Sequence, residues 1–189
     1  MAEGVYLWLD DTWEPPNPRF VWAKTAKAAK DILDTNTIVS MSLDYDLGDD
    51  KKNGTGLDVA NYVERLAHDD KIKPIKWFIH SANPVGGGNM RRALMRANDY
   101  WRKHEEMRQY MQLPLETLLA AISFRSLDVV HVGDDWVGTR YVVHLCSNKD
   151  SHPCETFDEL KRWIIKNYDY LISYHLRIEK EKDGTTSRE

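Results

Sequence analysis

Short apolar runs alternate with segments of helical periodicity along the first half of the chain. Four runs are short and rich in aliphatic and aromatic side chains, which is typical of strands; they cover residues 5–9, 19–22, 37–43 and 75–79. Residues 26–33 and 57–66 instead repeat apolar side chains at intervals of three and four, which predicts helices. Strands that alternate with helices form right-handed βαβ units, so we expect an α/β region with a mainly parallel sheet.

Proline, glycine and capping residues indicate the loops and helix ends. Residues 12–18 contain three prolines and are predicted to form a loop, because proline neither donates to a ladder nor continues a helix. Thr25 is the expected N-cap of the first helix. The polar segment 49–56 and the glycine triplet 86–88 are also predicted loops, and Asn89 is the expected N-cap of a helix over residues 90–102.

The pattern changes from about residue 104. Residues 113–122 are predicted to form a helix with Pro114 near its first turn. Two apolar runs, 126–132 and 137–145, predict an antiparallel hairpin with a turn near residues 133–135. Thr156 and Glu159 have the spacing of a capping box before a last helix.

Three parts are therefore expected along the chain. An α/β domain covers residues 1–104, and a small α+β region covers residues 105–182. A region of that size buries little surface by itself, so we expect it to pack on the first domain. The last residues, 183–189, are expected to be disordered.

Composition and charge limit the classes of function. Hydrophobic residues make up 42% of the 189 residues and charged residues 30%, and the formal net charge is -4 at pH 7. No apolar run approaches the roughly 20 residues that span a bilayer, and the first residues do not resemble a signal peptide, so no membrane association is expected. Two cysteines are too few for a disulfide framework, which favours a cytoplasmic location. The mild acidity argues against binding nucleic acid by bulk charge and leaves a local site open.

Acidic side chains follow two of the predicted strands directly. Asp10 and Asp11 follow the first strand, and Asp44 and Asp46 follow the strand over residues 37–43. Ligands of open parallel sheets bind beyond the carboxyl ends of the strands. Clustered carboxylates repel one another, and a hard divalent cation such as Mg²⁺ relieves that repulsion. A single aspartate at a strand end is more often a turn former, so the prediction of a cation or phosphate site depends on the convergence.

The strand over residues 75–79 ends in neutral polar groups, His80, Ser81 and Asn83. Histidine can move protons near neutral pH, whereas serine and asparagine donate hydrogen bonds to oxygen atoms. We therefore expect these groups to complete the site.

These motifs carry a resemblance to a known family. The order of an acidic pair, a later aspartate and then a serine, each at a strand end, is similar to the receiver domains of two-component signalling. The strings LWLDDxxxPP, SLDYDLG and IHSANPVGxxNM more closely resemble the receiver-like family named for cyclic-phosphate processing, over residues 4 to about 95. The resemblance implies a receiver-like (flavodoxin-like) sheet with flanking helices.

The resemblance also implies roles for individual residues. By position, Asp10, Asp11 and Asp44 would hold Mg²⁺ or Mn²⁺, with Asp44 as the central carboxylate. The catalytic candidates are Asp44, His80 and Ser81, and the substrate-binding candidates are Asp46, Asn83, Asn89 and Arg91.

One part of a signalling receiver is missing from the sequence. No apolar strand that ends in lysine follows residues 90–102, and such a lysine neutralises the phosphoryl group in signalling receivers. His80 adds instead a group that can move protons. Both differences favour metal-dependent processing of a phosphate ester, a cyclic phosphate on a nucleotide or RNA end, over a phosphoacceptor switch.

Of two other interpretations, the first stays open and the second is disfavoured. A non-catalytic module could bind Mg²⁺ or a phosphorylated ligand and recruit a protein partner through the C-terminal region, so whether the chain is an enzyme is left open. The Asp44-x-Asp46 spacing is also that of haloacid-dehalogenase-type phosphatases, but their signature belongs after the first strand, which here carries Asp10 and Asp11.

The second region contains a group of soft metal ligands, namely His144, Cys146, His152 and Cys154. Four such ligands suit tetrahedral zinc, but zinc sites usually place a dozen or more residues between the two pairs. The favoured interpretation is therefore structural, with buried strand residues followed by a loop, and zinc is left open.

Overall fold

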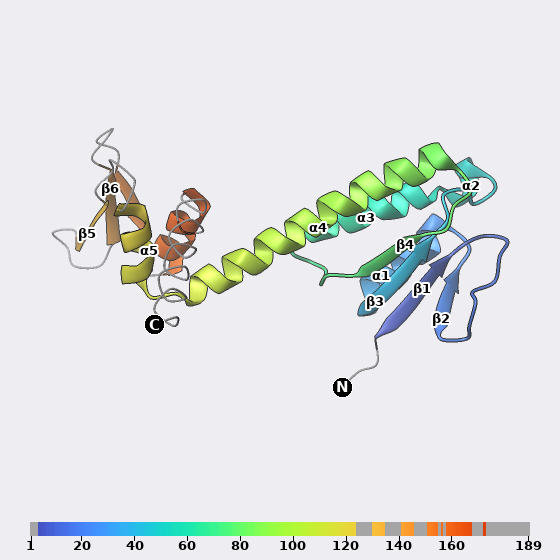
Figure 1. Cartoon of the computed structure of the whole chain (residues 1–189), viewed down its shortest axis with the longest axis horizontal. Helices are drawn as coiled ribbons and strands as arrows, with labels where there is room; N and C mark the ends of the chain where they lie inside the picture. The colour runs from blue at the N-terminus through green and yellow to red at the C-terminus, as the bar shows by residue number, and fades with distance from the viewer. Residues whose placement is uncertain are drawn as a thin grey trace, which may run out of the picture. The chain divides into compact units, whose positions relative to one another are not determined.

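Two compact units, Met1–His104 and Glu105–Glu189, make up the chain (Figure 1). The computed structural model describes residues 4–123, 130–134, 141–145, 151–154, 156, 158–167 and 172.

A four-stranded, all-parallel sheet forms the centre of the N-terminal unit (Figure 1). Its strands, in the spatial order β2–β1–β3–β4, are β1 (Val5–Leu9), β2 (Phe20–Ala23), β3 (Ile38–Leu43) and β4 (Lys76–Ile79). Leu7 lies beside Met41 and Leu9 beside Leu43, so the odd-numbered residues of these strands share one face. The parallel α/β sheet predicted from the alternation of elements is therefore confirmed, as are its four strands.

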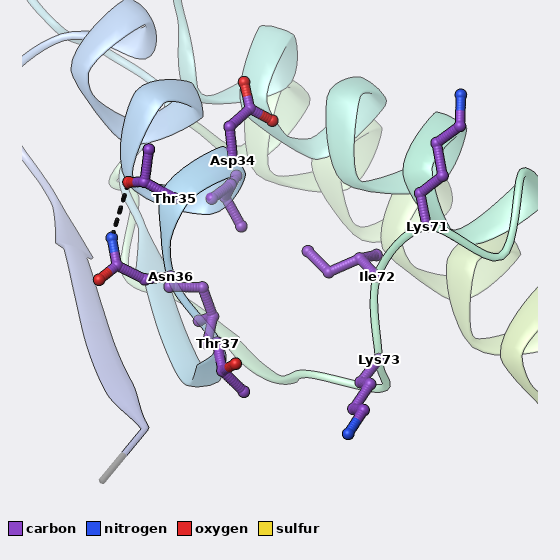
Figure 2. A pocket seen from close by; sticks show the side chains of 9 residues that line it. Asp34, Thr35, Asn36, Thr37, Lys71, Ile72 and Lys73 are labelled. Carbon is purple, nitrogen blue, oxygen red and sulfur yellow. Dashed lines mark hydrogen bonds between the residues drawn. The ribbon is translucent and has the colours of Figure 1, made fainter. Parts of the chain in front are cut away.

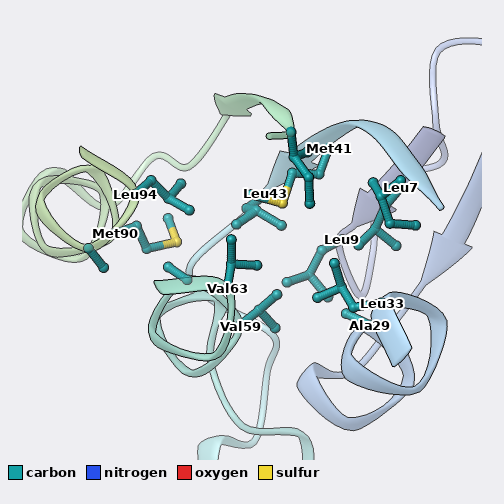
Figure 3. Close-up of a cluster of buried hydrophobic side chains, with 14 of the residues drawn as sticks. Leu7, Leu9, Ala29, Leu33, Met41, Leu43, Val59, Val63, Met90 and Leu94 are labelled. Carbon is teal, nitrogen blue, oxygen red and sulfur yellow. The ribbon is translucent and has the colours of Figure 1, made fainter. Parts of the chain in front are cut away.

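Three helices pack on that face: α1 (Ala26–Thr35), α3 (Gly56–His68) and the start of α4 (Pro84–Gln112). Figure 3 shows the core between them, where Leu9 and Leu43 from the sheet meet Leu33, Val63 and Leu94 from the helices. The helices begin where capping chemistry allows. The side chain of Thr25 accepts a hydrogen bond from the backbone of Ala28 at the start of α1, which confirms the predicted cap.

The opposite face of the sheet carries the even-numbered residues, except at the start of β3, where the register shifts and Ile38 lies in the helix-covered core. The large hydrophobic side chains of this opposite face are aromatic and do not belong to the helix-covered core; they are Tyr6, Trp8, Phe20, Trp22 and Phe78. Trp8 and Phe20 pack edge to face, and Phe78 is 49% exposed. The sheet is thus covered by helices on one face and lined by aromatic side chains on the other.

Two predicted loops are helical in the structure. Residues 50–53 form the single turn α2 (Asp50–Asn53), capped by the side chain of Asp49. The glycine triplet lies inside α4, because Asn83 and Pro84 begin that helix earlier than predicted. The side-chain oxygen of Asn83 accepts a hydrogen bond from the backbone of Gly86 at 2.9 Å, and proline is favoured at the first helical position.

The helix α4 also continues well beyond residue 102, where the sequence pattern placed its end. Residues 103–112 contain no proline or glycine that would break it. No helix in the described part of the chain, α4 included, is both long and apolar enough to cross a membrane.

The second unit contains α5 (Leu115–Ser123) and a three-stranded antiparallel sheet in the order β5–β6–β7. The strands are β5 (Val130–Asp134), β6 (Tyr141–Leu145) and β7 (Ser151–Cys154). The pairing of β5 with β6 confirms the predicted hairpin, although β5 extends into the segment expected to turn. The strand β7 was not predicted, since its residues were assigned to a loop.

A helix over residues 158–167 packs in the same unit, where Leu118, Leu160 and Ile164 are buried together. The Thr156 hydroxyl accepts from the backbone of Glu159, whose side chain accepts from the backbone of Thr156, so the predicted capping box is confirmed. The predictions for residues 168–171 and 173–189, including the disordered tail, lie outside the described residues.

Candidate functional site

The parallel ladder places three predicted site residues side by side at the carboxyl edge of the sheet. Beyond the strand ends, the backbone N–H of Asp10 donates to Ala23 at 3.1 Å, that of Asp44 to Leu9 at 2.9 Å, and that of His80 to Leu43 at 3.1 Å. These three bonds extend the ladder by one residue on each strand. The hydrogen bonds of the sheet therefore fix the backbones of Asp10, Asp44 and His80.

Three carboxylates converge at this edge, as the positions of the strand ends predicted. One oxygen each from Asp10, Asp11 and Asp44 lies within 4.8 Å of the others. Asp10 is buried, with 3% of its surface exposed. No lysine or arginine of the described residues forms an ion pair with any of the three. Three carboxylates without a lysine or arginine partner are a donor set that fits a hard divalent cation such as Mg²⁺ or Mn²⁺.

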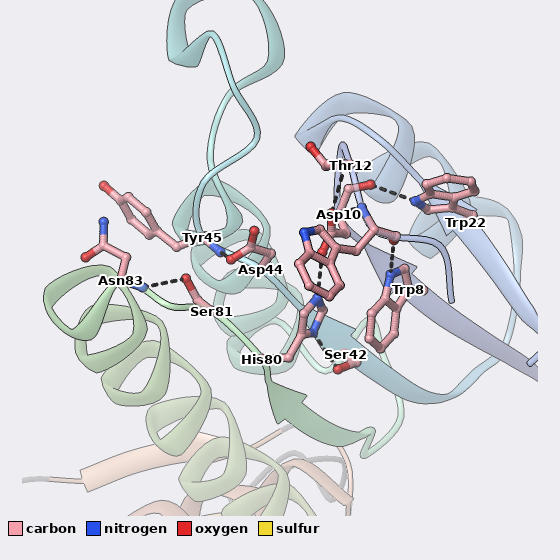
Figure 4. Close-up of polar contacts among 11 residues, drawn as sticks. Trp8, Asp10, Thr12, Trp22, Ser42, Asp44, Tyr45, His80, Ser81 and Asn83 are labelled. Carbon is pink, nitrogen blue, oxygen red and sulfur yellow. Dashed lines mark hydrogen bonds and ion pairs between the residues drawn. The ribbon is translucent and has the colours of Figure 1, made fainter. Parts of the chain in front are cut away.

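Asp10 holds the loop that follows β1 as well as facing the cluster (Figure 4). Its Oδ1 accepts hydrogen bonds from the backbone of Thr12 at 2.9 Å and of Trp13 at 2.6 Å. Its Oδ2 is 3.2 Å from Nε2 of His80. The proline-containing loop is thus anchored to the same carboxylate that contributes to the cluster.

His80 is held on three sides. Its Nδ1 lies 2.8 Å from the hydroxyl of Ser42, and its ring stacks on Trp8 with 4.0 Å between ring centroids and 12° between planes. A ring that donates from Nε2 to Asp10 can accept a hydrogen bond from the Ser42 hydroxyl at Nδ1 when it is neutral, and donates one to that hydroxyl oxygen when it is protonated. The imidazole is therefore oriented with its Nε2–H directed at the carboxylate cluster.

Ser81, Asn83 and Asp46 form a second group at the start of α4. The backbone N–H of Asn83 donates to the Ser81 hydroxyl oxygen at 3.2 Å, and the Asn83 side-chain amide reaches Asp46 at 3.5 Å. The other end of that amide caps α4. Asp46 is not among the carboxylates that converge with Asp44, which leaves the DxD interpretation without a paired site.

Asn89 and Arg91 lie within α4 and make no contact with the acidic cluster among the described residues. Asn89 hydrogen-bonds Arg92 along the helix, and Arg91 is exposed. The prediction that Asn89 is an N-cap is wrong, because Asn83 occupies that position six residues earlier. Their part in substrate binding stays a prediction.

Two glycines allow the close packing around Asp44 and Tyr45. A Cβ on Gly56 would lie 1.9 Å from the carbonyl oxygen of Asp44, and a Cβ on Gly86 would lie 2.3 Å from the ring of Tyr45. Both distances are shorter than side-chain atoms can adopt. Gly86 therefore permits the close packing of Tyr45 on α4.

Ser42, Trp8 and Trp13 contact the site and were missed from the sequence. The alternation of the strands contains a usable signal for two of them, because residues 8 and 42 face the same side as Asp10 and Asp44. Trp13 has no such signal, since its position depends on the path of the loop.

A second hollow of about 370 Å³ lies at the opposite edge of the sheet, near the end of α1 and the start of β3 (Figure 2). It is lined by polar side chains that include Asp34, Lys71 and Lys73. The Tyr62 hydroxyl donates a hydrogen bond to the Asp34 carboxylate, and this bond raises the pKa of Tyr62 above its usual value of 10.0. Ligands of parallel sheets bind at the other edge, so the acidic cluster is the stronger candidate.

The parallel sheet and the acidic cluster at its carboxyl edge together define a receiver-like domain, which here has four parallel strands. Residues 4–104 contain no fifth strand with a terminal lysine, because α4 continues where that strand would begin. The family described as Cyclic-phosphate processing Receiver domain matches residues 5–96, so this part of the chain belongs to that family. Neither a curated protein nor a solved structure gives a significant match to the chain.

The soft ligands of the second unit lie partly in described strands. His144 belongs to β6, and His152 and Cys154 belong to β7, where His152 pairs with Val143 and Cys154 with Tyr141. Cys146 lies outside the described residues, as do the side chains of the other three. The zinc hypothesis therefore stays open.

Proposed function

We propose that the N-terminal unit binds Mg²⁺ or Mn²⁺ through Asp10, Asp11 and Asp44 and processes a cyclic phosphate on a nucleotide or RNA end. The observation that carries the proposal is the convergence of these carboxylates without a lysine or arginine partner among the described residues, directly beside His80. The family to which residues 5–96 belong is named for this class of substrate.

Each residue of the site has a separate role in the proposed hydrolysis. The cation, when bound, would polarise a phosphoryl oxygen and activate a water molecule. The backbone N–H of Tyr45 donates to Oδ1 of Asp44 at 2.7 Å, which fixes the orientation of this carboxylate in the cluster. In its protonated form, His80 would donate the Nε2 proton to the ribose oxygen that leaves when water adds to phosphorus, and the neutral ring would keep its proton at Nδ1 beside Ser42. One proton of the water would stay on the phosphate, and the other would restore the protonated ring. The hydroxyl of Ser81 is left with a proton to donate to a phosphoryl oxygen.

Turnover of a nucleoside 2′,3′-cyclic monophosphate tests the proposal. Purified protein is incubated with Mg²⁺ or Mn²⁺, and ring opening is followed by phosphorus NMR. We expect turnover in the wild type, none in Asp44→Asn or His80→Ala, and unchanged turnover in the control Asp50→Asn, whose carboxylate lies in α2 outside the cluster. Absence of turnover with either metal would exclude the enzymatic proposal for this substrate class.

One observation favours a second candidate, a non-catalytic module that binds a phosphorylated ligand and recruits a protein through the C-terminal region. Both ring nitrogens of His80 are engaged inside the protein, which also suits a rigid binding site. In that case the wild type binds the cyclic nucleotide in a metal-dependent manner, measured by calorimetry, and leaves it intact.

A further inference from the structure

A cavity of about 540 Å³ opens beside the acidic cluster on the aromatic face of the sheet. This volume lies in the range of roughly 300–1,000 Å³ typical of small-molecule sites. Its apolar wall is formed by Trp8, Trp13, Pro16 and Ala82, and the wall continues directly into Asp10, Asp44 and His80. The cavity therefore joins an aromatic surface to the candidate phosphate site in one hollow.

The charged and the apolar parts of the cavity lining suit different parts of a ligand. Its titratable lining residues are Asp10, Asp44, Glu14 and His80, and no lysine or arginine lines it among the described residues. A phosphate is attracted there only where a cation offsets the carboxylates. The apolar wall, which carries no charge of its own, therefore suits an uncharged flat group.

Trp13 is held as an exposed platform at this cavity. Its backbone N–H donates to Asp10 at 2.6 Å, and its carbonyl oxygen accepts from the indole of Trp8 at 2.9 Å. Its side chain is nevertheless 74% exposed, and its indole ring stacks on no aromatic ring of the described residues. Leaving a large aromatic side chain in water forgoes the free energy of its burial, so a fixed and exposed tryptophan at a cavity is suited to stacking on a ligand.

The ring of Trp8, by contrast, already has two aromatic partners. His80 stacks on it and Phe20 packs against it edge to face. Trp8 therefore supports the site, and Trp13 supplies the free surface.

We propose that this cavity is a nucleobase-binding subsite, with the base stacked on Trp13 while the cyclic phosphate lies at the carboxylate cluster. This inference rests on the proposed function and extends it, because it assigns the residue on which the base of the nucleotide stacks. Base stacking on an aromatic side chain contributes about 1–3 kcal/mol per base, which corresponds to roughly 5- to 150-fold in affinity.

Calorimetry with three ligands tests the subsite on the full chain with Mg²⁺. The ligands are adenosine 2′,3′-cyclic monophosphate, methyl riboside 2′,3′-cyclic phosphate, which lacks the base, and adenosine, which lacks the phosphate. We expect Trp13→Ala to weaken binding of both base-containing ligands by roughly 5- to 150-fold and to leave the baseless ligand unchanged. Trp13→Phe should restore most of the affinity, since phenylalanine also stacks.

A matched control is available on the same face of the sheet. Phe78 is also an exposed aromatic residue, but it does not line the cavity, so Phe78→Ala should leave all three affinities unchanged.

The outcomes separate this inference from the proposed function. Equal wild-type affinity for the nucleotide and the baseless ligand would overturn the subsite and leave the phosphate site intact. Adenosine binding that depends on Trp13, without metal-dependent binding of the baseless ligand, would retain the subsite and overturn the phosphate site. If Trp13→Ala alters self-association in sedimentation and not nucleotide affinity, Trp13 is a protein-docking residue and the inference is wrong.

Discussion

His80 donates from Nε2 to Oδ2 of Asp10 across 3.2 Å, although the two residues are 70 positions apart in the sequence. They end β4 and β1, which are not neighbours in the sheet, because β3 lies between them. The bond therefore crosses the end of β3. Ser42 of β3 hydrogen-bonds Nδ1, the other nitrogen of the same ring. Three strand ends are thus linked through one imidazole.

Ser42→Ala tests whether this link positions His80. Loss of one hydrogen bond should lower kcat by roughly 2- to 10-fold and leave KM nearly unchanged, since Ser42 is buried and does not line the ligand cavity. Steady-state kinetics on a cyclic nucleotide measures both constants. Ser42→Thr keeps the hydroxyl and should recover activity, whereas a change in KM alone would argue for a role in binding.

Neighbouring glycines of α4 are predicted to respond in opposite directions to alanine. Gly86→Ala should destabilise the protein by about 1–3 kcal/mol, because its Cβ would overlap the ring of Tyr45. Gly87→Ala should stabilise it by about 0.5–1 kcal/mol, because its Cβ meets only Ile79 at 3.6 Å and alanine favours a helix. Urea unfolding measures both free energies. A destabilising Gly87→Ala would contradict the helical assignment of the triplet.

Asn83 is predicted to stabilise the start of α4. Asn83→Ala removes the cap on Gly86 and should lower the free energy of unfolding by about 0.5–2 kcal/mol. Asn83→Ser retains a capping oxygen and should cost much less. Equal losses in the two variants, measured by thermal unfolding, would show that the amide acts through Asp46 instead.

Tyr62 is predicted to make stability depend on pH in the alkaline range. Its hydrogen bond to Asp34 raises the pKa of its hydroxyl, so the folded state keeps this proton at pH values where the unfolded chain has lost it. The contribution is fully present below pH 10.0 and is lost as pH rises through the higher folded pKa. Urea titrations below and above pH 10.0 give the free energy of unfolding at each pH. This free energy should fall less for Tyr62→Phe than for the wild type.

Most of the N-terminal fold could be predicted from sequence because its strands are short apolar runs and its helices have clear caps, such as Thr25. The glycine triplet could not, because local glycine propensity opposes the helix that Asn83 and Pro84 begin and that the packing of Gly86 on Tyr45 requires. In the second unit, β7 was missed because it is short and contains a proline.

The acidic cluster was predictable for a different reason. Parallel strands bring their carboxyl ends to one edge, so Asp10 and Asp44 converge whatever the details of packing. The contacts of Ser42 with His80, and of Trp13 with Asp10, depend on side-chain direction and loop path, which the strand pattern does not determine.

A metal titration of thermal unfolding tests the central claim most directly, with wild type, Asp44→Asn and the control Asp50→Asn. A cation that binds only the folded state stabilises it by about 2.7 kcal/mol at 100 times its Kd. We expect Mg²⁺ or Mn²⁺ to raise the Tm of the wild type and of Asp50→Asn but not of Asp44→Asn. Without metal, Asp44→Asn should be more stable than the wild type, because it relieves repulsion among the three carboxylates. An unchanged wild-type Tm, or an equal rise in Asp44→Asn, would contradict a cation site at Asp10, Asp11 and Asp44.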